Sequence, residues 1–387
     1  MNLMSTQRRP GKLVRSTVRI SRGSQQVDLP VWVASGRQPG PTGLLSAGIH
    51  GDEVHAISLL HHFVQKLDFK QLTGRLLIVP VANVSGFHAG SRTVTQDGRD
   101  LNRGFPGDPK GTFSERIAHF IFTELTATAD WGVDLHDSGS GSVLLPHARV
   151  HDPEVLDLGA AFGTEIVMKT TLPPGYHGIL SIEAQKHYRR RFFHVEVGGG
   201  AILWKHLIEK GLTGLRNLLI YEGMLPGKLV LPRHQFFLPG RDTLIRPAPI
   251  EGLLIQQVAL GQAVVKGQTL ATIENPLNKK HAVLRARANG IVHDLNVRAK
   301  VNAGEDVVGV IGFGAFNGHK AKPWRTSMEK RTNHPGKTVR VRDSEIFSAD
   351  GLCWICHRPV KGSATQVAKK AGRQGGRIGS PQTIIPP

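Results

Sequence analysis

Three short segments of the chain place histidine and carboxylate side chains where they could bind a metal ion. His50 and Glu53 lie three residues apart, just before an expected helix, so one turn can aim both side chains at a single point. Imidazole nitrogens and carboxylate oxygens are normal zinc ligands. His136 ends an apolar segment and could complete the set, leaving a fourth position open, as in catalytic zinc sites. Taken alone, His136 is equally compatible with a hydrogen-bonded, half-buried histidine at the end of a strand.

The third segment contains a carboxylate suited to acid–base chemistry. Glu196 stands inside a strongly apolar segment that ends in three glycines, at residues 198–200. A buried carboxylate is costly unless it is paired or functional, and one beside a metal-bound water can act as a general base. The glycines would let a substrate approach the backbone closely. The alternative is an edge-strand glutamate that faces water.

Polar residues between the first two segments could recognise a carboxylate. Asn102 and Arg103 form a pair on an expected turn, and guanidinium groups bind carboxylates through two parallel hydrogen bonds. The alternative is a surface loop with solvated charges. Asp134 and Asp137 lie close enough to His136 in the sequence to be hydrogen-bond partners of a ligand imidazole.

The apolar pattern around these residues alternates expected strands with expected helices. Buried strands are expected at residues 42–48, 76–79, 131–135 and 192–197, and helices at 54–67 and 114–127. A capping box from Thr112 to Glu115 begins the second helix. This order predicts an α/β fold with a mixed, mostly parallel sheet flanked by helices. In such sheets, sites form at the carboxyl ends of the strands, where the polar clusters lie.

The order of four motifs resembles the succinylglutamate desuccinylase/aspartoacylase family, which belongs to the zinc carboxypeptidase-like fold class. The motifs are H-x-x-E from His50, D-L-N-R-x-F-P-G from Asp100, D-L-H ending at His136 and E-V-G-G-G from Glu196. The resemblance covers about residues 40–315. It implies one zinc ion per chain, bound by His50, Glu53 and His136. It also implies an amidohydrolase that cleaves a small N-acyl amino acid or N-acylated amine.

The resemblance assigns roles to the other side chains as well. Glu196 would deprotonate the zinc-bound water and later pass the proton to the leaving amine. Asn102 and Arg103 would bind the substrate carboxylate. Arg92 would stabilise the oxyanion, with Arg99 as the alternative, because this loop is longer than in aspartoacylases proper.

The sequence pattern changes at about residue 240, where the helical periodicity of apolar residues ends. Short apolar runs alternate with glycine turns, and two similar units, at residues 252–273 and 290–310, predict a small all-β module with internal pseudo-symmetry. The module resembles the lipoyl/biotinyl-like module that follows the catalytic domain in this family. Its candidate hairpin tip, at residues 275–280, lacks the Met-Lys-Met or Asp-Lys-Ala sequence that surrounds the modified lysine of biotin and lipoate carriers. This difference favours a structural or site-covering role for the module.

The charge of the chain is concentrated at its two ends. The 387 residues carry a formal net charge of +19, a balance that usually indicates nucleic acid or an anionic surface as a partner. Residues 315–387 hold 14 Lys and Arg against 4 Asp and Glu, and residues 1–22 hold six basic residues and no acid. The central part is close to neutral, which argues against a nucleic-acid-binding face.

Four segments are therefore expected along the chain. They are a basic N-terminal segment (1–22), a zinc-dependent catalytic domain (23–239), a small β module (240–314) and a basic, disordered tail (315–387). The tail holds Cys353 and Cys356 in a C-x-x-C-H motif, the attachment signature of c-type haem. No export signal or expected core accompanies the motif, so we expect a non-homologous extension without haem.

Three other functions compete with the amidohydrolase hypothesis: a zinc metallocarboxypeptidase acting on peptides, a non-enzymatic nucleic-acid-binding protein, and a pseudoenzyme. The short interval between Glu53 and His136 favours the acylase by resemblance. No apolar run approaches the ~20 residues of a membrane span, and no apolar export segment follows Met1. We therefore expect a cytoplasmic enzyme with a small-molecule substrate and no membrane partner. The family often forms oligomers, which leaves a homo-oligomer open.

Overall fold

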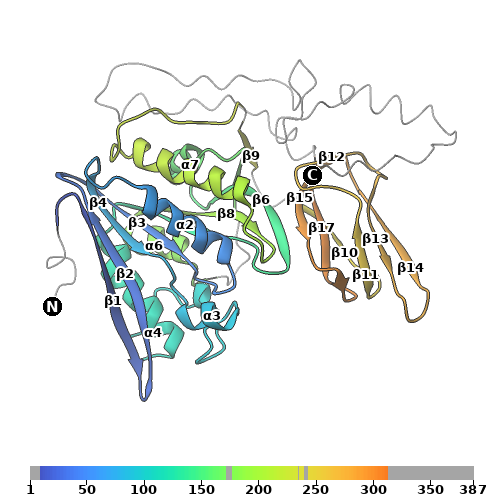
Figure 1. Ribbon diagram of the computed structural model, residues 1–387, viewed down its shortest axis with the longest axis horizontal. Coiled ribbons are helices and arrows are strands. Elements are labelled where there is room, and N and C mark those ends of the chain that lie inside the picture. The colour runs from blue at the N-terminus through green and yellow to red at the C-terminus, as the bar shows by residue number, and fades with distance from the viewer. Residues whose placement is uncertain (1–8, 171–176, 234, 239–242, 313–387) are drawn as a thin grey trace. The chain divides into compact units, whose positions relative to one another are not determined.

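The computed structural model describes residues 9–170, 177–233, 235–238 and 243–312, all of which belong to one compact unit (Figure 1). The tail predicted at residues 315–387, with both cysteines, lies outside the described residues. The division of the chain into four segments stays a prediction.

Strands and helices alternate through the first part of the chain. The strands are β1 (Lys12–Arg22), β2 (Gln25–Ser35), β3 (Gln38–Ala47), β4 (Thr73–Val79), β5 (Trp131–His136), β6 (Ser142–Val150), β7 (Ile166–Lys169), β8 (Arg191–Gly199) and β9 (Phe236–Leu238). The helices are α2 (Val54–Lys66), α3 (Val84–Ala89), α4 (Phe113–Phe120), α5 (Leu156–Phe162), α6 (Leu180–Tyr188) and α7 (Lys205–Tyr221). Short 3₁₀ turns lie at Leu101–Arg103, Thr126–Thr128 and Pro153–Val155.

These strands form a mixed sheet in the order β1-β2-β4-β3-β5-β8-β6. The central neighbours β4–β3, β3–β5 and β5–β8 are parallel, whereas β1–β2, β2–β4 and β8–β6 are antiparallel. Two apolar clusters cover the two faces, one with α2, α5 and α7 and the other with α4 and α6 (Figure 1). The prediction of a mixed sheet flanked by helices is confirmed.

Most of the expected elements form where the sequence places them. Helix α2 begins at Val54, and β4 ends at Val79, directly before Pro80, which has no backbone N–H to donate to a strand partner. The expected capping box joins Thr112 and Glu115 at the start of α4.

The helix expected at residues 114–127 forms over residues 113–128, but it is a regular α-helix only as far as Phe120. Helix α4 ends at Phe120 and continues as a π-helical turn at Ile121–Leu125. Threonine hydroxyls explain the difference, because Thr123 donates to the His119 carbonyl and Thr126 donates to the Ile121 carbonyl. Such side-chain bonds compete with regular helical hydrogen bonding.

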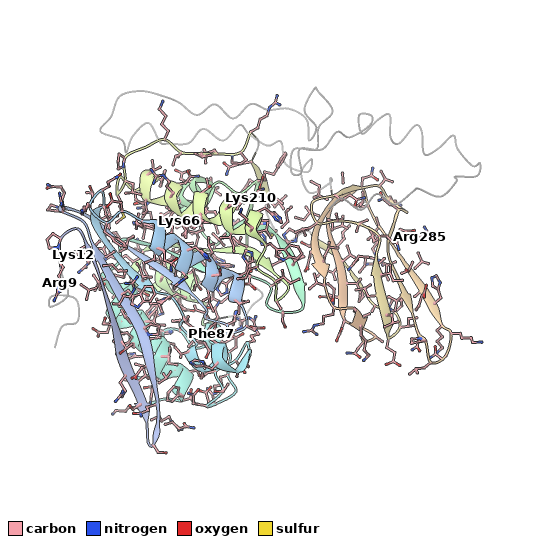
Figure 2. The ribbon with its side chains drawn as sticks, in the orientation of Figure 1. Arg9, Lys12, Lys66, Phe87, Lys210 and Arg285 are labelled. Carbon is pink, nitrogen blue, oxygen red and sulfur yellow. The ribbon has the colours of Figure 1, made fainter. Side chains whose placement is uncertain are left out.

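Four of the basic residues near the N-terminus lie in an edge strand of the same sheet: Lys12, Arg15, Arg19 and Arg22. Strand β1 pairs with β2 over its whole length. Arg19 pairs with Asp28 at 2.8 Å, and the Arg15 guanidinium lies 5.2 Å from the centre of the Trp32 ring. Exposed basic side chains also occur on separate elements, from Lys12 on β1 to Lys66 on α2 and Arg285 on β14 (His281–Arg285) (Figure 2).

The last part of the described chain is the expected β module. Its strands are β10 (Thr243–Pro247), β11 (Gly252–Gln256), β12 (Ala263–Val264), β13 (Thr269–Glu274), β14 (His281–Arg285), β15 (Gly290–Asn296), β16 (Lys300–Val301) and β17 (Asp306–Gly312). The two similar sequence units form β11–β13 and β15–β17. The short strand of each unit pairs with the first strand of the other, β12 with β15 and β16 with β11, which gives the module its pseudo-symmetry.

The module is joined to the catalytic sheet through backbone hydrogen bonds. Strand β15 pairs antiparallel with β6, with Asp294 opposite Leu144. His293 of the module lies 3.2 Å from His147 of β6, Nε2 to Nδ1, and both imidazoles are buried. Among the described residues, no helix is both long and apolar enough to cross a membrane.

Candidate metal centre and active site

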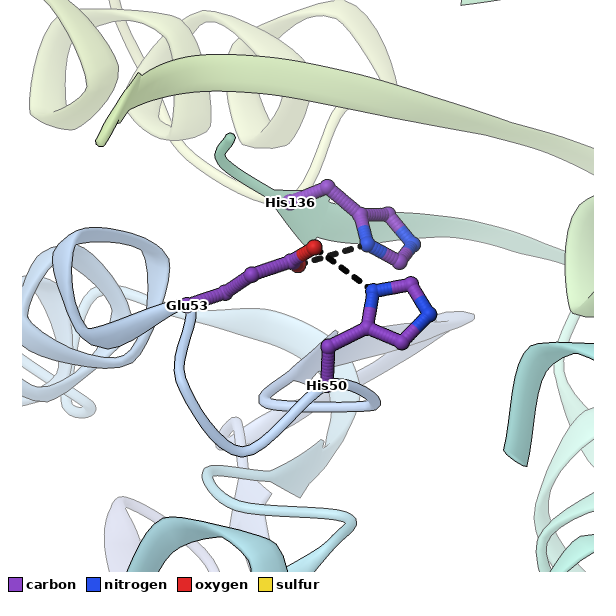
Figure 3. A group of neighbouring side chains, drawn as sticks. All are labelled: His50, Glu53 and His136. Atoms are coloured by element: carbon purple, nitrogen blue, oxygen red, sulfur yellow. Dashed lines mark hydrogen bonds and ion pairs between the residues drawn. The ribbon is translucent and has the colours of Figure 1, made fainter. Parts of the chain in front are cut away.

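His50, Glu53 and His136 meet at the carboxyl ends of β3 and β5 (Figure 3). His50 and Glu53 lie in the loop from β3 to α2, and His136 is the last residue of β5. Because β3 and β5 are parallel neighbours, both strands end at the same edge of the sheet. Glu53 Oε1 lies 2.6 Å from His50 Nδ1, and Glu53 Oε2 lies 2.8 Å from His136 Nδ1. All three residues are buried, and their ligand atoms lie within 4.8 Å of one another.

The loop that carries the first two residues is held by close backbone packing. Gly48, the first residue after β3, has a φ of 66°, a conformation that favours glycine. A Cβ atom on Gly51 would stand 2.0 Å from the carbonyl carbon of Gly86 in α3, so only glycine fits there. Glu53 is the residue directly before α2. The sequence G-x-H-G-x-E therefore allows a sharp turn that presents both side chains together.

The outer nitrogen of each imidazole faces a second carboxylate. His136 Nε2 lies 2.7 Å from Asp134 Oδ2, and His50 Nε2 lies 3.0 Å from Asp100 Oδ1. Such partners fix the orientation of a ligand histidine and leave its other nitrogen for the metal. The expected role of Asp134 is thus supported, whereas Asp137 accepts hydrogen bonds from the backbone amides of Ala56 and Gly139 instead of an imidazole.

The charges of this cluster suit a divalent cation. Burial lowers the pKa of His136, but Asp134 and Glu53 outweigh burial and raise it well above its usual value. Burial likewise lowers the pKa of His50, and Glu53 and Asp100 raise it overall. Both imidazoles beside Glu53 therefore have a higher proton affinity than a free imidazole. A dication bound by two nitrogens and a carboxylate would replace protons at these nitrogens, and this donor set fits zinc with an open position.

Glu196 lies beside the cluster on the neighbouring strand. Strands β5 and β8 are parallel, with His136 directly opposite Glu196, so both side chains point to the same face of the sheet. Because β8 lies between β5 and β6, the alternative of a water-facing edge strand is wrong. Burial raises the pKa of Glu196, and His136 and Arg149 lower it in part. Arg149 on β6 approaches Glu196 Oε1 to 3.5 Å.

Comparisons with known proteins show to which family the chain belongs. The family described as the succinylglutamate desuccinylase/aspartoacylase catalytic domain matches residues 39–221. An N-alpha-acetyl-L-2,4-diaminobutyric acid deacetylase from Halomonas elongata is 33% identical over 293 residues, which cover 73% of this chain and 84% of the relative. This chain belongs to the succinylglutamate desuccinylase/aspartoacylase family.

Solved structures of family members share the fold. A succinylglutamate desuccinylase from Silicibacter sp. TM1040 aligns with a TM-score of 0.70 and 27% identity, covering 79% of this chain and 96% of that one. The product-bound ectoine utilization protein EutE (DoeB) from Ruegeria pomeroyi aligns with a TM-score of 0.69 and 30% identity, covering 79% and 97%. The similarity therefore extends over nearly the whole length of these family members.

Arg92, predicted to stabilise the oxyanion, and Asn102, predicted to bind the substrate carboxylate, lie against the cluster. Arg92 is half-exposed, and its guanidinium lies 3.6 Å from Glu53 Oε1 and 3.1 Å from Asp100 Oδ2. Asn102 is buried, with Nδ2 3.4 Å from His136 Nε2, and its Oδ1 accepts a hydrogen bond from the Leu180 amide. In this family member, both side chains are thus placed next to the predicted metal ligands.

Arg103 and Arg99, the other two residues predicted to contact the substrate, each donate a hydrogen bond to a different part of the structure. Arg103 follows Asn102 in the same 3₁₀ turn and donates to the Asn102 carbonyl at 2.7 Å. Arg99 donates to Glu115 Oε1 of α4 at 3.3 Å, and in the described part of the chain none of its ion pairs joins it to the metal cluster. Arg92, and not Arg99, is therefore next to the predicted metal ligands, although the oxyanion role itself stays a prediction.

Sequence reasoning assigned no role to two residues of this family member's site, Asp100 and Arg149. Asp100 opens the D-L-N-R motif, but its contact with His50 depends on how two loops pack together. Arg149 reaches Glu196 only because β6 pairs antiparallel with β8. His147 and Arg149 are two residues apart on an apolar strand, so their side chains share one face of the sheet. This spacing was the available signal in the sequence for a row of polar side chains there.

Proposed function

We propose that this family member is a zinc-dependent amidohydrolase that removes the acyl group from a small N-acyl amino acid. One observation carries the proposal: the buried His50–Glu53–His136 cluster has an ionisable carboxylate, Glu196, directly opposite His136 on the adjacent strand. Two imidazoles and a carboxylate bind a catalytic zinc, and a neighbouring glutamate is the group needed to move a proton.

The residues of the chain have complementary tasks in this reaction. Zinc held by His50, Glu53 and His136 would polarise the acyl oxygen and increase the acidity of a water molecule. Glu196 takes the proton of the attacking water and delivers it to the leaving amine. Arg92 offers a guanidinium to the negative charge that develops on the acyl oxygen.

The carboxylate of the substrate would bind at the turn that carries Asn102 and Arg103. Asn102 is fixed between His136 and the first turn of α6, so the turn cannot shift without disturbing the metal ligand. Arg103 supplies the positive charge that a free carboxylate needs. A substrate held here by its carboxylate has its scissile amide close to the metal cluster.

A relative matched over 84% of its own length supports an acetyl group as the acyl group. The Halomonas protein is named as a deacetylase of N-α-acetyl-L-2,4-diaminobutyric acid. A relative named succinylglutamate desuccinylase, from Burkholderia lata, matches only 27% of this chain and 34% of its own length. We therefore propose an N-acetyl amino acid of about the size of N-α-acetyl-L-2,4-diaminobutyric acid as the first substrate to test.

The test measures release of free amine from four compounds by the full chain. The compounds are N-α-acetyl-L-2,4-diaminobutyrate, N-acetyl-L-aspartate, N-succinyl-L-glutamate and an unblocked dipeptide. Each is offered to metal-free protein with and without added zinc. We expect zinc-dependent hydrolysis of an N-acyl amino acid. Hydrolysis of the dipeptide alone would support the metallocarboxypeptidase instead, and zinc-independent hydrolysis would contradict the mechanism.

A further inference from the structure

Asp100 contacts three parts of the site at once. Its Oδ1 atom lies 3.0 Å from His50 Nε2 and accepts a hydrogen bond from the Asn102 amide at 2.8 Å. Its Oδ2 atom accepts a hydrogen bond from the Arg92 guanidinium at 3.1 Å. One carboxylate therefore joins a predicted metal ligand, the arginine beside the cluster and the turn that carries Asn102 and Arg103.

Asp134, the carboxylate beside the other predicted histidine ligand, forms hydrogen bonds with fewer parts of the site than Asp100 does. Asp134 Oδ2 lies 2.7 Å from His136 Nε2, and its Oδ1 accepts a hydrogen bond from the Ser46 hydroxyl at 2.7 Å. Asp134 and Ser46 are paired in register on β5 and β3, inside the sheet. Asp134 thus holds a ligand imidazole to the rigid sheet, and its hydrogen bonds include no predicted substrate residue.

The position of Asp100 in the chain makes its contacts interdependent. Asp100 is the residue directly before the 3₁₀ turn Leu101–Arg103, and its side chain caps that turn. A displacement of the turn therefore moves the carboxylate that orients His50. Conversely, a metal ion that fixes His50 also fixes Asp100, and with it the direction of the Arg92 guanidinium.

We propose that Asp100 is a positioning residue that couples metal binding to recognition of the substrate carboxylate. This inference rests on the proposed function, because Asn102 and Arg103 must bind that carboxylate. A carboxylate bound at the turn stabilises the same arrangement of Asp100 that a metal on His50 requires. By linkage, each ligand then tightens the binding of the other. Asp134 provides no such connection.

The matched variants Asp100→Asn and Asp134→Asn test this difference, since each replaces one carboxylate oxygen by an amide nitrogen at constant size. The first measurement is the dissociation constant of zinc, by competition with a chromogenic chelator and without substrate. We expect both variants to bind zinc about 10–100-fold more weakly than the unmodified protein, as is typical for partners of metal ligands.

The second measurement separates the two carboxylates. At saturating zinc, Asp100→Asn should raise KM for the N-acetyl amino acid about tenfold, the loss of a hydrogen bond to a charged group, whereas Asp134→Asn should leave KM close to its original value. The product L-2,4-diaminobutyrate should tighten zinc binding in the unmodified protein and in Asp134→Asn, and should not do so in Asp100→Asn. Thermal unfolding of each variant checks that it is folded.

The outcomes that overturn the inference are distinct from failure of the proposed function. Equal KM changes in the two variants, or unchanged zinc affinity in Asp100→Asn, would show that Asp100 does not couple the two sites. Absence of zinc binding in the unmodified protein would instead refute the proposed function. If Asp100→Asn does not fold, Asp100→Glu serves in its place, because the longer side chain displaces the turn and should raise KM in the same way.

Discussion

The ion pair between Arg149 and Glu196 gives a prediction about the pH dependence of turnover. In the proposed mechanism Glu196 can take a proton only when it is ionised, and Arg149 holds its pKa below the value that burial alone would give. Replacing Arg149 by glutamine removes the positive charge and keeps a similar length. The pKa of Glu196 should rise, so the base is protonated at a higher pH. The acid limb of the kcat/KM profile should therefore shift upward.

The size of this shift follows from the geometry of the pair. Two unit charges at 3.5 Å attract by ~5 kcal/mol at an effective dielectric constant of ~20 and by ~1 kcal/mol in water. The two side chains keep only 19% and 14% of their exposure, so the value in water is a lower limit for their attraction. Because a shift of one pKa unit corresponds to about 1.4 kcal/mol, the acid limb should move by at least about one pH unit.

The assay is amine release from an N-acetyl amino acid by zinc-loaded protein across the acid range. Arg149→Lys is the matched control, because it keeps the charge and should leave the acid limb close to its original position. An acid limb that stays in place in Arg149→Gln, or that moves to lower pH, would refute the assignment of Glu196 as the titrating base.

Three further predictions concern the base, the arginines and the metal. Glu196→Gln should keep zinc bound, as measured by metal analysis, and lower kcat by about 10²–10⁴-fold, the usual contribution of general base catalysis; near-normal turnover would contradict this role. Arg103→Ala should raise KM for an N-acyl amino acid, whereas Arg99→Ala should not, because Arg99 pairs with Glu115; similar KM values in the two variants would argue against the carboxylate site. Zinc affinity should fall as pH decreases, because protons compete with zinc for His50 and His136. The fall should begin above the usual imidazole range, because Glu53, Asp100 and Asp134 outweigh burial and raise the pKa of these two histidines. Chelator competition at several pH values measures the affinity, and a pH-independent affinity would exclude the imidazoles as ligands.

The features predicted correctly from the sequence depend on local pattern and on parallel strands. His50 and His136 follow apolar segments that become the parallel neighbours β3 and β5, so their convergence could be inferred without knowing any distance. The capping box at Thr112 and the glycine turns of the β module are likewise local signals. The pseudo-symmetry of that module could be predicted because both units keep nearly the same spacing.

The features that sequence reasoning missed depend on long-range packing. The contact of Asp100 with His50 requires two loops, fifty residues apart, to meet above the sheet. Arg149 reaches Glu196 because β6 runs antiparallel beside β8, an orientation that no local pattern specifies. The ion pair of Arg99 with Glu115 of α4 depends in the same way on packing.

A titration of metal-free protein with zinc, read out as amine release from an N-acyl amino acid, tests the central claim most directly. The His50–Glu53–His136 cluster predicts that turnover rises with added zinc and stops rising at one equivalent per chain. The variant His136→Ala, measured in parallel, should not reach that turnover at one equivalent. Turnover that does not depend on zinc, or a His136→Ala variant that titrates like the unmodified protein, would contradict a catalytic metal at this cluster.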